Sequence, residues 1–313
     1  MINTITLNPA IDCILFIDRF ERNVTARIRE KKEALGGKGA HISVNLALLG
    51  EQNQAFGILF GETGKKIEGM INDAGVTPRF VYGESGNGRE SRTNYVVIEE
   101  SGGSTIVAEQ GSRLSDAEVR SVLEALLADT EKDDVFVFSG DASNVDDPYV
   151  YNRFIEALGQ SAGKVYVDAS GPALKKALEA APFLIKPNRG ELEEVTGIEI
   201  KNDADAIRAI SSLDSYGIGN IALTLGDKGA IVRFKDGSVL RADAPFVTVK
   251  NTAGCGDAFL SGFIAGIERG WDSERTLRLA TAVSAATAAD PLTVGFSKEY
   301  ADSLMDKVNI KSL

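Results

Sequence analysis

The sequence predicts an α/β fold in which helices cover both faces of a mostly parallel sheet. Short apolar runs alternate with segments of helical periodicity along most of the chain, as in sheets built from strand–helix–strand units. The chain has 313 residues, which is long enough to bury one large core. We expect residues 1–313 to form a single domain, because no linker, internal repeat or low-complexity tract interrupts the pattern.

Continuous apolar runs are typical of strands that are buried on both faces. They predict strands at residues 2–7, 54–58, 135–139, 164–167, 183–185 and 221–225. Apolar residues at helical spacing predict helices at residues 40–49, 65–74, 116–127, 148–160, 204–213, 257–268 and 273–289. Ser115 and Glu118, three residues apart, are typical of a helix N-terminus and place the start of the third helix.

Two segments depart from this alternation. Residues 12–33 and 80–107 alternate apolar and polar side chains and contain Gly and Asn turns, which predicts half-exposed antiparallel strands. Such strands do not fit inside a core that is covered on both sides. We therefore expect them to form a small β lid that protrudes over one edge of the main domain.

Composition narrows the class of protein. The net charge is -11, from 34 basic and 45 acidic residues, and no dense run of Lys and Arg points to nucleic acid as a partner. No apolar stretch approaches the roughly 20 residues of a membrane helix, and no secretory signal is visible. Cys13 and Cys255 have no metal-ligand spacing and do not make a disulfide framework, so we expect a cytoplasmic protein.

The strongest motif is NTAGCGDAF at residues 251–259, where two glycines bracket one residue just before a helical pattern. Glycines permit a tight turn, and the unpaired N–H groups of a helix N-terminus bind anions. Asp257 in the first turn has two readings. It is either a favourable helix charge, contributing about 0.3–1 kcal/mol, or a base beside a transferring phosphoryl group.

A second glycine-rich turn, LGGKGAH at residues 35–41, also opens a helix. It indicates either a ligand that approaches the backbone closely, with Lys38 supplying positive charge, or a tight turn with an exposed lysine. It is not a P-loop, because the glycine spacing is wrong and no Ser or Thr follows Lys38. The sequence GIGNIA at residues 217–222 precedes a strand, so it is not a dinucleotide-binding turn.

The third motif, KPNRGE at residues 186–191, follows an apolar run and so lies at the carboxyl end of a strand, where open α/β sheets bind ligands. Asn188 and Glu191 lie on one face of a starting helix. They could hold water on Mg²⁺, or they could form a capping box.

Together these motifs, with TLNPAID at 6–12, SRTN at 91–94, VDASG at 167–171 and TLGDKGA at 224–230, resemble the PfkB (ribokinase-like) carbohydrate kinase family. The resemblance runs from residue 6 to residue 259. It is closest to the branch of 1-phosphofructokinase and tagatose-6-phosphate kinase. It implies a ribokinase-like three-layer α/β/α fold with a β lid, and a lid that pairs two copies into a homodimer.

The implied activity is Mg²⁺- and ATP-dependent phosphoryl transfer to a phosphorylated ketohexose. Fructose 1-phosphate is the first expectation and tagatose 6-phosphate the alternative. Lys38 and Arg92 favour a sugar phosphate over a free sugar, because a neutral acceptor needs no cations in its pocket. A non-catalytic sugar- or nucleotide-binding regulator on the same fold is the remaining alternative, although ligand binding alone does not need Asp257.

The resemblance also assigns residues to roles. Asp257 would be the base, and the N–H groups of Gly254, Cys255 and Gly256 would hold the transferring phosphoryl group. The acceptor sugar would lie against Asp12, Gly37, Lys38, His41, Arg92 and Asn94. The nucleotide would lie against Lys186, Asn188, Glu191, Thr224, Gly226 and Gly229, with Asn188 and Glu191 ordering Mg²⁺ through water.

The chain departs from the family pattern at several positions. Ala253 stands where Thr or Val is usual and Cys255 where Ala or Ser is usual, and a backbone anion hole tolerates both. His41, the single histidine, replaces an Asn that contacts the sugar, which leaves the identity of the acceptor open. Residues 105–111 lack the Glu and Asn of the branch. A helix N-terminus would lower the pKa of the Cys255 thiol, whereas Cys13 is expected to pack in the lid.

Overall fold

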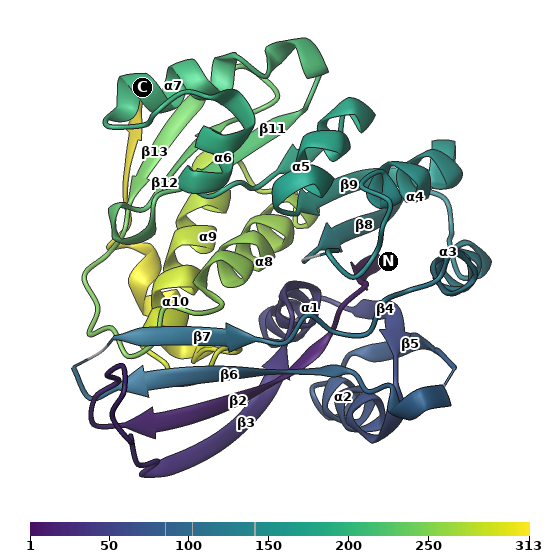
Figure 1. Cartoon of the computed structure of the whole chain (residues 1–313). Helices are drawn as coiled ribbons and strands as arrows, with labels where there is room; N and C mark the ends of the chain where they lie inside the picture. The colour runs from purple at the N-terminus through teal and green to yellow at the C-terminus, as the bar shows by residue number, and fades with distance from the viewer. Residues whose placement is uncertain (85, 102, 141) are drawn as a thin grey trace.

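The computed structural model describes residues 1–84, 86–101, 103–140 and 142–313 (Figure 1). A ten-stranded sheet has the order β14-β13-β12-β11-β10-β9-β8-β1-β4-β5. Neighbours from β5 through β11 are parallel, and those from β11 through β14 are antiparallel. The strands are β1 (Ile2–Thr6), β4 (Asn53–Leu59), β5 (Thr77–Tyr82), β8 (Asp134–Ser139), β9 (Ala162–Asp168), β10 (Leu184–Ile185), β11 (Asn220–Thr224), β12 (Ala230–Arg233), β13 (Val239–Asp243) and β14 (Asn309–Ser312).

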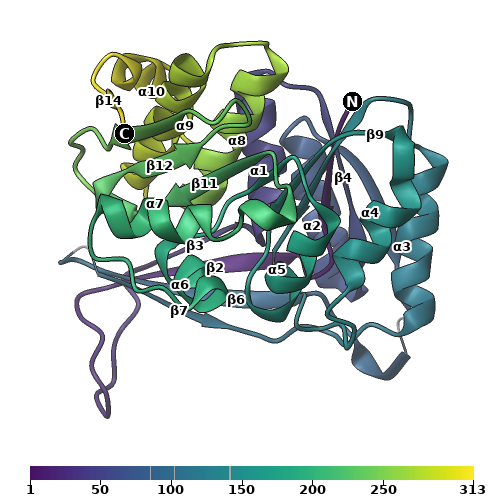
Figure 2. The same ribbon diagram turned by 90° about the horizontal axis from the view of Figure 1, so that it is seen from above.

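Helices cover both faces of this sheet, as the view in Figure 2 shows. One layer contains α3 (Asp116–Ala128), α4 (Val150–Leu158), α5 (Gly171–Ala177), α6 (Arg189–Thr196) and α7 (Asp203–Ser211). The other contains α1 (Lys38–Leu49), α2 (Gly61–Asp73), α8 (Cys255–Glu268), α9 (Ser273–Ala288) and α10 (Lys298–Met305). None of the described helices is both long enough and apolar enough to span a bilayer.

Strand β8 shows why the apolar runs are continuous. Phe136 and Phe138 lie in the core beneath the α3–α7 layer, whereas Val135 and Val137 lie in the core beneath α1, α8 and α9. Because successive side chains of a strand point to opposite faces, a sheet that is covered twice needs apolar residues at every position.

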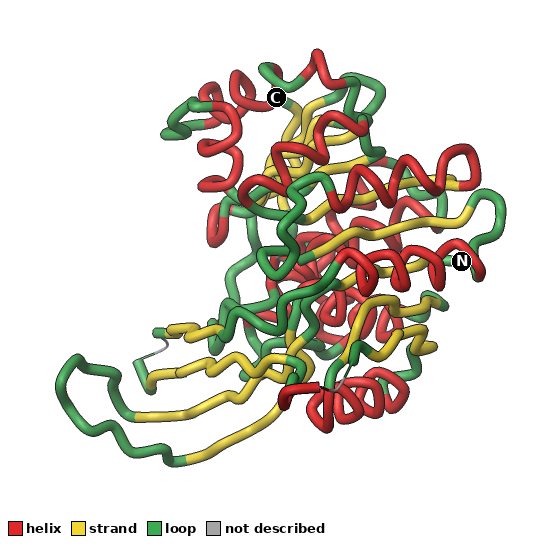
Figure 3. Tube along the Cα trace, turned by 45° about the vertical axis from the view of Figure 1, so that its right-hand side comes forward, coloured by secondary structure: helices red, strands yellow, loops and turns green. Residues whose placement is uncertain are grey.

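A second sheet of four strands, with the order β3-β2-β6-β7, stands off the main domain (Figure 3). Its strands are β2 (Ala10–Ile17), β3 (Glu30–Gly36), β6 (Arg92–Glu99) and β7 (Ser104–Ala108). The predicted antiparallel pairing is wrong for its central pair, because β2 and β6 are parallel from Ala10↔Arg92 to Ile17↔Glu99. β2 follows β1 and β6 follows β5, which are themselves parallel strands of the main sheet, and both leave it in the same direction.

The predicted boundary of the second segment is also wrong at its start. Residues 80–82 end β5, the edge strand of the main sheet, and pair with residues 57–59 of β4. At this edge of the sheet the helices cover β5 only in part, and its residues are exposed or half-buried largely in alternation, so β5 carries the same pattern as the strands of the second sheet.

Candidate active site

A cleft of about 1060 Å³ lies between the two sheets, where the parallel strands of the main sheet end. Both sheets contribute to its lining, as do α1, α8 and α9. The structure brings all of the predicted site residues to this lining with the exception of Glu191. These residues are Asp12, Gly37, Lys38, His41, Arg92, Asn94, Lys186, Asn188, Thr224, Gly226, Gly229, Gly254, Cys255, Gly256 and Asp257.

The turn before α8 presents backbone donors to the cleft. Gly254 is the N-cap residue, with φ of 80°, a left-handed conformation that favours glycine. Within the described residues the N–H groups of Gly254 and Gly256 have no hydrogen-bond partner, and that of Cys255 is 3.5 Å from the carbonyl oxygen of Thr252. These donors lie at the positive end of the α8 dipole, so they can bind an anion.

Asp257 lies in the first turn of α8 and is buried beside these donors. Its Oδ2 is 2.7 Å from Nδ1 of His41, so the carboxylate forms a hydrogen bond with a residue of α1. Asp257 also affects its neighbour: burial and the Asp257 charge raise the pKa of the Cys255 thiol to about 12. The predicted lowering of this pKa is therefore wrong, because burial and the charge of Asp257 outweigh the backbone hydrogen bond that lowers it.

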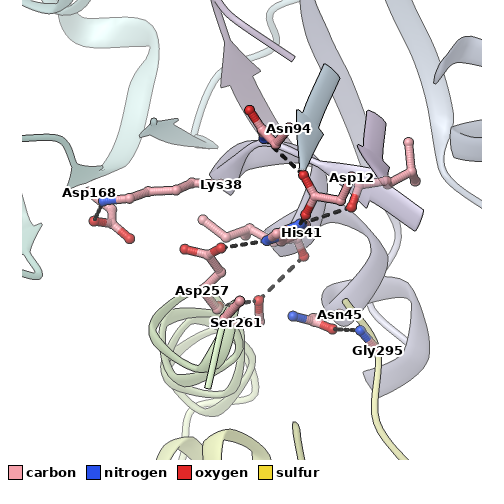
Figure 4. A network of polar contacts seen from close by, with 12 residues as sticks. Asp12, Lys38, His41, Asn45, Asn94, Asp168, Asp257, Ser261 and Gly295 are labelled. Atoms are coloured by element: carbon pink, nitrogen blue, oxygen red, sulfur yellow. Dashed lines mark hydrogen bonds and ion pairs between the residues drawn. The ribbon is translucent and has the colours of Figure 1, made fainter. Parts of the chain in front are cut away.

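His41 lies on α1 between two carboxylates, as Figure 4 shows. Its Nε2 donates to the carbonyl oxygen of Leu35 at 2.9 Å and is 3.5 Å from Oδ2 of Asp12. Burial alone would lower the pKa of the ring, but hydrogen bonds and charge from Asp12 and Asp257 outweigh it and raise the pKa to about 10. His41 is therefore a buried residue that pairs with a carboxylate on either side.

Asp12 lies on β2 and ties this cluster to the second sheet. Its Oδ1 accepts a hydrogen bond of 2.8 Å from Nδ2 of Asn94 on β6. Burial raises the pKa of Asp12, but the hydrogen bond and charge of His41, together with the Asn94 hydrogen bond, lower it below its usual value. The carboxylate of Asp12 is therefore ionised and faces the cleft.

Lys38 and Lys186 both pair with a carboxylate, Asp168, that is not among the predicted site residues. Lys38 Nζ is 3.0 Å from Oδ1 of Asp168, and Lys186 Nζ is 3.1 Å from Oδ2. Asp168 is fully buried at the end of β9; burial raises its pKa, and the charges of Lys186 and Lys38 outweigh this effect and lower it. Asp168 ends one apolar run and Lys186 directly follows another, and these two runs form the neighbouring parallel strands β9 and β10. Because ligands bind at the carboxyl ends of such strands, the position of Asp168 at the end of its apolar run is the signal that could have identified it.

Asn188 and Glu191 form the capping box of α6. Glu191 N donates to Asn188 Oδ1 at 2.9 Å, and Asn188 N donates to Glu191 Oε2 at 2.8 Å. The other oxygen of Glu191, Oε1, is 3.7 Å from Nζ of Lys38. The capping interpretation is thus confirmed, and it leaves one carboxylate oxygen of Glu191 beside the cleft.

The remaining predicted residues lie at the two ends of the cleft. Arg92 donates from Nε to the carbonyl oxygen of Asn8 at 3.1 Å and from a terminal nitrogen to that of Glu109 at 3.2 Å. At the other end, Thr224, Gly226 and Gly229 surround the turn after β11. Residues 244–247 also line this end, with Phe246 95% exposed. No sequence pattern identified them, since a single exposed aromatic residue in a loop has no periodicity.

Comparisons with known proteins identify the family of the chain. The model of the pfkB family carbohydrate kinases matches residues 5–298. The 1-phosphofructokinase of Bacillus subtilis (strain 168) is 29% identical over 313 residues, which cover 100% of both chains. The 1-phosphofructokinase of Escherichia coli (strain K12) is 30% identical over 309 residues, 98% of this chain and 97% of the relative.

A solved structure shares the fold. Phosphofructokinase-2 from Escherichia coli, in complex with substrates and products, superimposes with a TM-score of 0.90 over 97% of this chain and 98% of that one, at 23% identity. At this identity the likeness concerns the fold alone. The predicted ribokinase-like α/β/α fold is confirmed.

Proposed function

Because the chain belongs to the pfkB family of carbohydrate kinases, we propose that it transfers the terminal phosphoryl group of ATP to fructose 1-phosphate, giving fructose 1,6-bisphosphate. One observation carries the reaction type. The buried carboxylate of Asp257 lies in the same helical turn as the N–H groups of Gly254 and Gly256. A base and an anion site that adjoin in this way are what phosphoryl transfer to a hydroxyl requires.

The proposed reaction proceeds at this turn. Asp257 accepts the proton of the acceptor hydroxyl, whose oxygen forms a bond to the terminal phosphorus as the bond to the ADP oxygen breaks. The N–H groups of Gly254, Cys255 and Gly256 stabilise the charge on the transferring group. Closure of the second sheet over the acceptor would exclude water that otherwise hydrolyses ATP.

The acceptor assignment depends on the cations of the cleft and on the relatives. Lys38 and Arg92 both line the cleft, and Asp12 and Asn94 line it as hydrogen-bonding partners for hydroxyl groups. Two relatives that match nearly the whole chain are 1-phosphofructokinases. A phosphorylated ketohexose uses both the cations and the hydroxyl partners.

The nucleotide is proposed to lie along the ends of β10 and β11, against Lys186, Asn188, Thr224, Gly226 and Gly229. The described residues contain no cluster of three His, Cys, Asp or Glu side chains that could enclose a metal ion. Mg²⁺ that binds substrate phosphates keeps several waters and needs only one or two carboxylates. Oε1 of Glu191, which lies outside the capping box and 3.7 Å from Nζ of Lys38, fits this requirement, and with Asn188 it would hold such an ion through water. Bound Mg²⁺ would neutralise charge on the phosphate groups.

A substrate panel tests the proposed function. The purified protein is mixed with Mg²⁺, ATP and one of several sugars and sugar phosphates, and ADP release is measured. We expect kcat/KM to be highest for fructose 1-phosphate. A higher value for tagatose 6-phosphate would change the acceptor only, whereas a preference for ribose or a nucleoside would contradict the sugar-phosphate assignment. Binding of ATP and sugar without ADP production would favour a regulator on the same fold.

We also propose that the second sheet pairs two copies of the chain and that the protein acts in the cytoplasm. Two apolar side chains of this sheet, Tyr95 and Val107, are exposed opposite each other on the face that does not line the cleft, and a partner sheet would cover them. Both cysteines are free thiols, which suits a reducing compartment. Analytical ultracentrifugation tests the dimer, and a monomer at micromolar concentration would contradict it.

A further inference from the structure

The contact between His41 and Asp257 joins the proposed base to a residue on a different helix. The two residues are 216 positions apart in sequence, and α1 and α8 pack side by side. Oδ2 of Asp257 is 2.7 Å from Nδ1 of His41, and within the described residues Oδ1 has no hydrogen-bond partner. The two oxygens of this carboxylate are therefore not equivalent.

The hydrogen bonds of the ring fix its protons. Nε2 faces the carbonyl oxygen of Leu35 at 2.9 Å, and a carbonyl only accepts, so Nε2 must carry a proton. At 2.7 Å a second proton must lie between Nδ1 and Oδ2 of Asp257, because a bare nitrogen and a carboxylate oxygen would repel each other. This proton is either on His41, leaving Asp257 as a carboxylate, or on Asp257, leaving no free base.

The surroundings decide where this proton lies. The charged groups near the ring are Asp257 from α8, Asp12 from β2 and, on the ring's own helix, Lys38, whose charge acts on Asp257. Strand β6 contributes the neutral amide of Asn94, which binds Asp12, and the cation Arg92, which also lines the cleft and donates to backbone carbonyl oxygens. Two carboxylates around one buried ring favour the doubly protonated imidazolium.

We propose that His41 is the positioning residue of the phosphoryl-transfer base: as an imidazolium it holds Oδ2 of Asp257, leaves Oδ1 to accept the hydroxyl proton, and links Asp257 to the acceptor-binding carboxylate Asp12. This inference rests on the proposed function. In the transfer step the hydroxyl proton moves to Oδ1, the hydroxyl oxygen bonds to the terminal phosphorus of ATP, and ADP leaves. His41 itself exchanges no proton with the substrate.

The link to Asp12 adds a consequence for the acceptor. Asp12 lies on the second sheet and Asp257 on the main domain, so the imidazolium ties the base to the sheet that covers the acceptor. The positive charge of the ring between the two buried carboxylates also allows both of them to stay ionised. Without a cation between them, burial and mutual repulsion would favour protonation of one carboxylate. A neutral side chain at position 41 does not supply this charge.

Nuclear magnetic resonance of the ring nitrogens tests the proposal without any activity. His41 is the only histidine, so the untagged, ¹⁵N-labelled full chain gives one set of imidazole signals. We expect both ring nitrogens to stay protonated from about pH 6 to about pH 9, where an ordinary histidine would lose a proton. A midpoint near the ordinary histidine value, or an unprotonated Nδ1 at neutral pH, would overturn the proposal. In Asp257→Asn we expect the titration midpoint of His41 to fall between about pH 6 and about pH 9. Ring signals that match those of the wild type over this range would count against the proposal.

Kinetics supplies the second arm. His41→Gln keeps a hydrogen-bond donor but removes the charge, which favours the protonated form of Asp257. The acid limb of kcat/KM for the acceptor should therefore move to higher pH by about one unit, and kcat should fall about 10- to 100-fold through misplacement of the base. The KM for ATP should change little, because His41 lies at the acceptor end of the cleft. A wild-type pH profile in His41→Gln would contradict the proposal.

Ser261→Ala is the matched control. Ser261 Oγ contacts the backbone carbonyl oxygens of Asp257, at 2.8 Å, and of Ile42, at 3.4 Å, so it joins the same two helices without touching the carboxylate. We expect its pH profile to match that of the wild type. The same shift as in His41→Gln would assign the effect to helix packing and overturn the proposal. Absence of ADP formation with every acceptor would contradict the proposed function instead, and would leave the resonance result standing.

Discussion

Gly254 lies against the carbonyl oxygen of Thr293, so close that a Cβ atom at this position would be 1.9 Å from that oxygen. The φ of Gly254 is also positive, at 80°. Two independent constraints, space and backbone conformation, therefore require glycine at the turn that presents the proposed anion-binding N–H groups. The loop that contains Thr293 fixes the position of these donors.

Gly254→Ala should therefore displace the turn and lower kcat by about 100-fold or more, the effect of losing one such donor in other enzymes. Steady-state kinetics with ATP and fructose 1-phosphate measures this. The matched control is Gly270→Ala, since Gly270 has φ of 70° and a Cβ atom added there would meet nothing within 4 Å. We expect this control to lose about 1–2 kcal/mol of stability with unchanged kcat. An active Gly254→Ala enzyme would exclude these N–H groups from the transfer step.

Glu191 offers a test that separates its two roles. Glu191→Gln should preserve the capping box of α6, because an amide oxygen can still accept from Asn188 N. Glu191→Ala should break it and lower the free energy of unfolding by about 1 kcal/mol. If Oε1 helps to hold hydrated Mg²⁺, both variants need about tenfold more Mg²⁺ for half-maximal rate. Unchanged Mg²⁺ dependence in both would leave Glu191 as a capping residue only.

Cys255 should be unreactive in the native protein. With a pKa of about 12, its thiolate fraction at pH 8 is on the order of one in ten thousand, so iodoacetamide should label it slowly. Asp257→Asn removes a charge that raises this pKa and should accelerate labelling, which mass spectrometry of the modified peptide would show. Cys255→Ser should keep kcat within about threefold, because the proposed donor is the backbone N–H. Rapid labelling of the native wild-type protein would contradict the burial of this thiol.

Stability should depend on pH through His41. The folded-state pKa of about 10 lies above the unfolded value of 6.5. The stabilisation is therefore fully present below pH 6.5 and is lost as the pH rises through 10. We expect the difference in unfolding free energy between wild type and His41→Gln to shrink over this interval, as measured by urea denaturation at several pH values. A constant difference would mean that His41 contributes through packing alone.

The sequence predicted those features that depend on local patterns. Buried strands such as β8, the capped helix after Ser115 and the turn before Asp257 each carry their signal within a few neighbouring residues. The prediction for residues 80–82 is wrong because the residues of this edge strand are as incompletely buried as those of a protruding sheet. The parallel pairing of β2 and β6 depends on where their preceding strands end, and no local pattern contains that information.

The site was predicted as a list of residues, without its contacts. The glycine-rich turns and the ends of β10 and β11 identified most of the cleft lining. The link from Asp12 through His41 to Asp257 joins three elements that are far apart in sequence, and only the folded chain brings them together. Asp168 has its partners at Lys38 and Lys186, so its role depends on neighbouring strands and on α1.

The most direct test of the central claim is ³¹P nuclear magnetic resonance of a reaction containing Mg²⁺, ATP and fructose 1-phosphate, with wild type and Asp257→Asn in parallel. We predict that wild type forms fructose 1,6-bisphosphate and ADP in equal amounts. We predict that Asp257→Asn does so at least about 100-fold more slowly, while ATP still binds in calorimetry. Product formation by Asp257→Asn at the wild-type rate would contradict the assignment of Asp257 as the base.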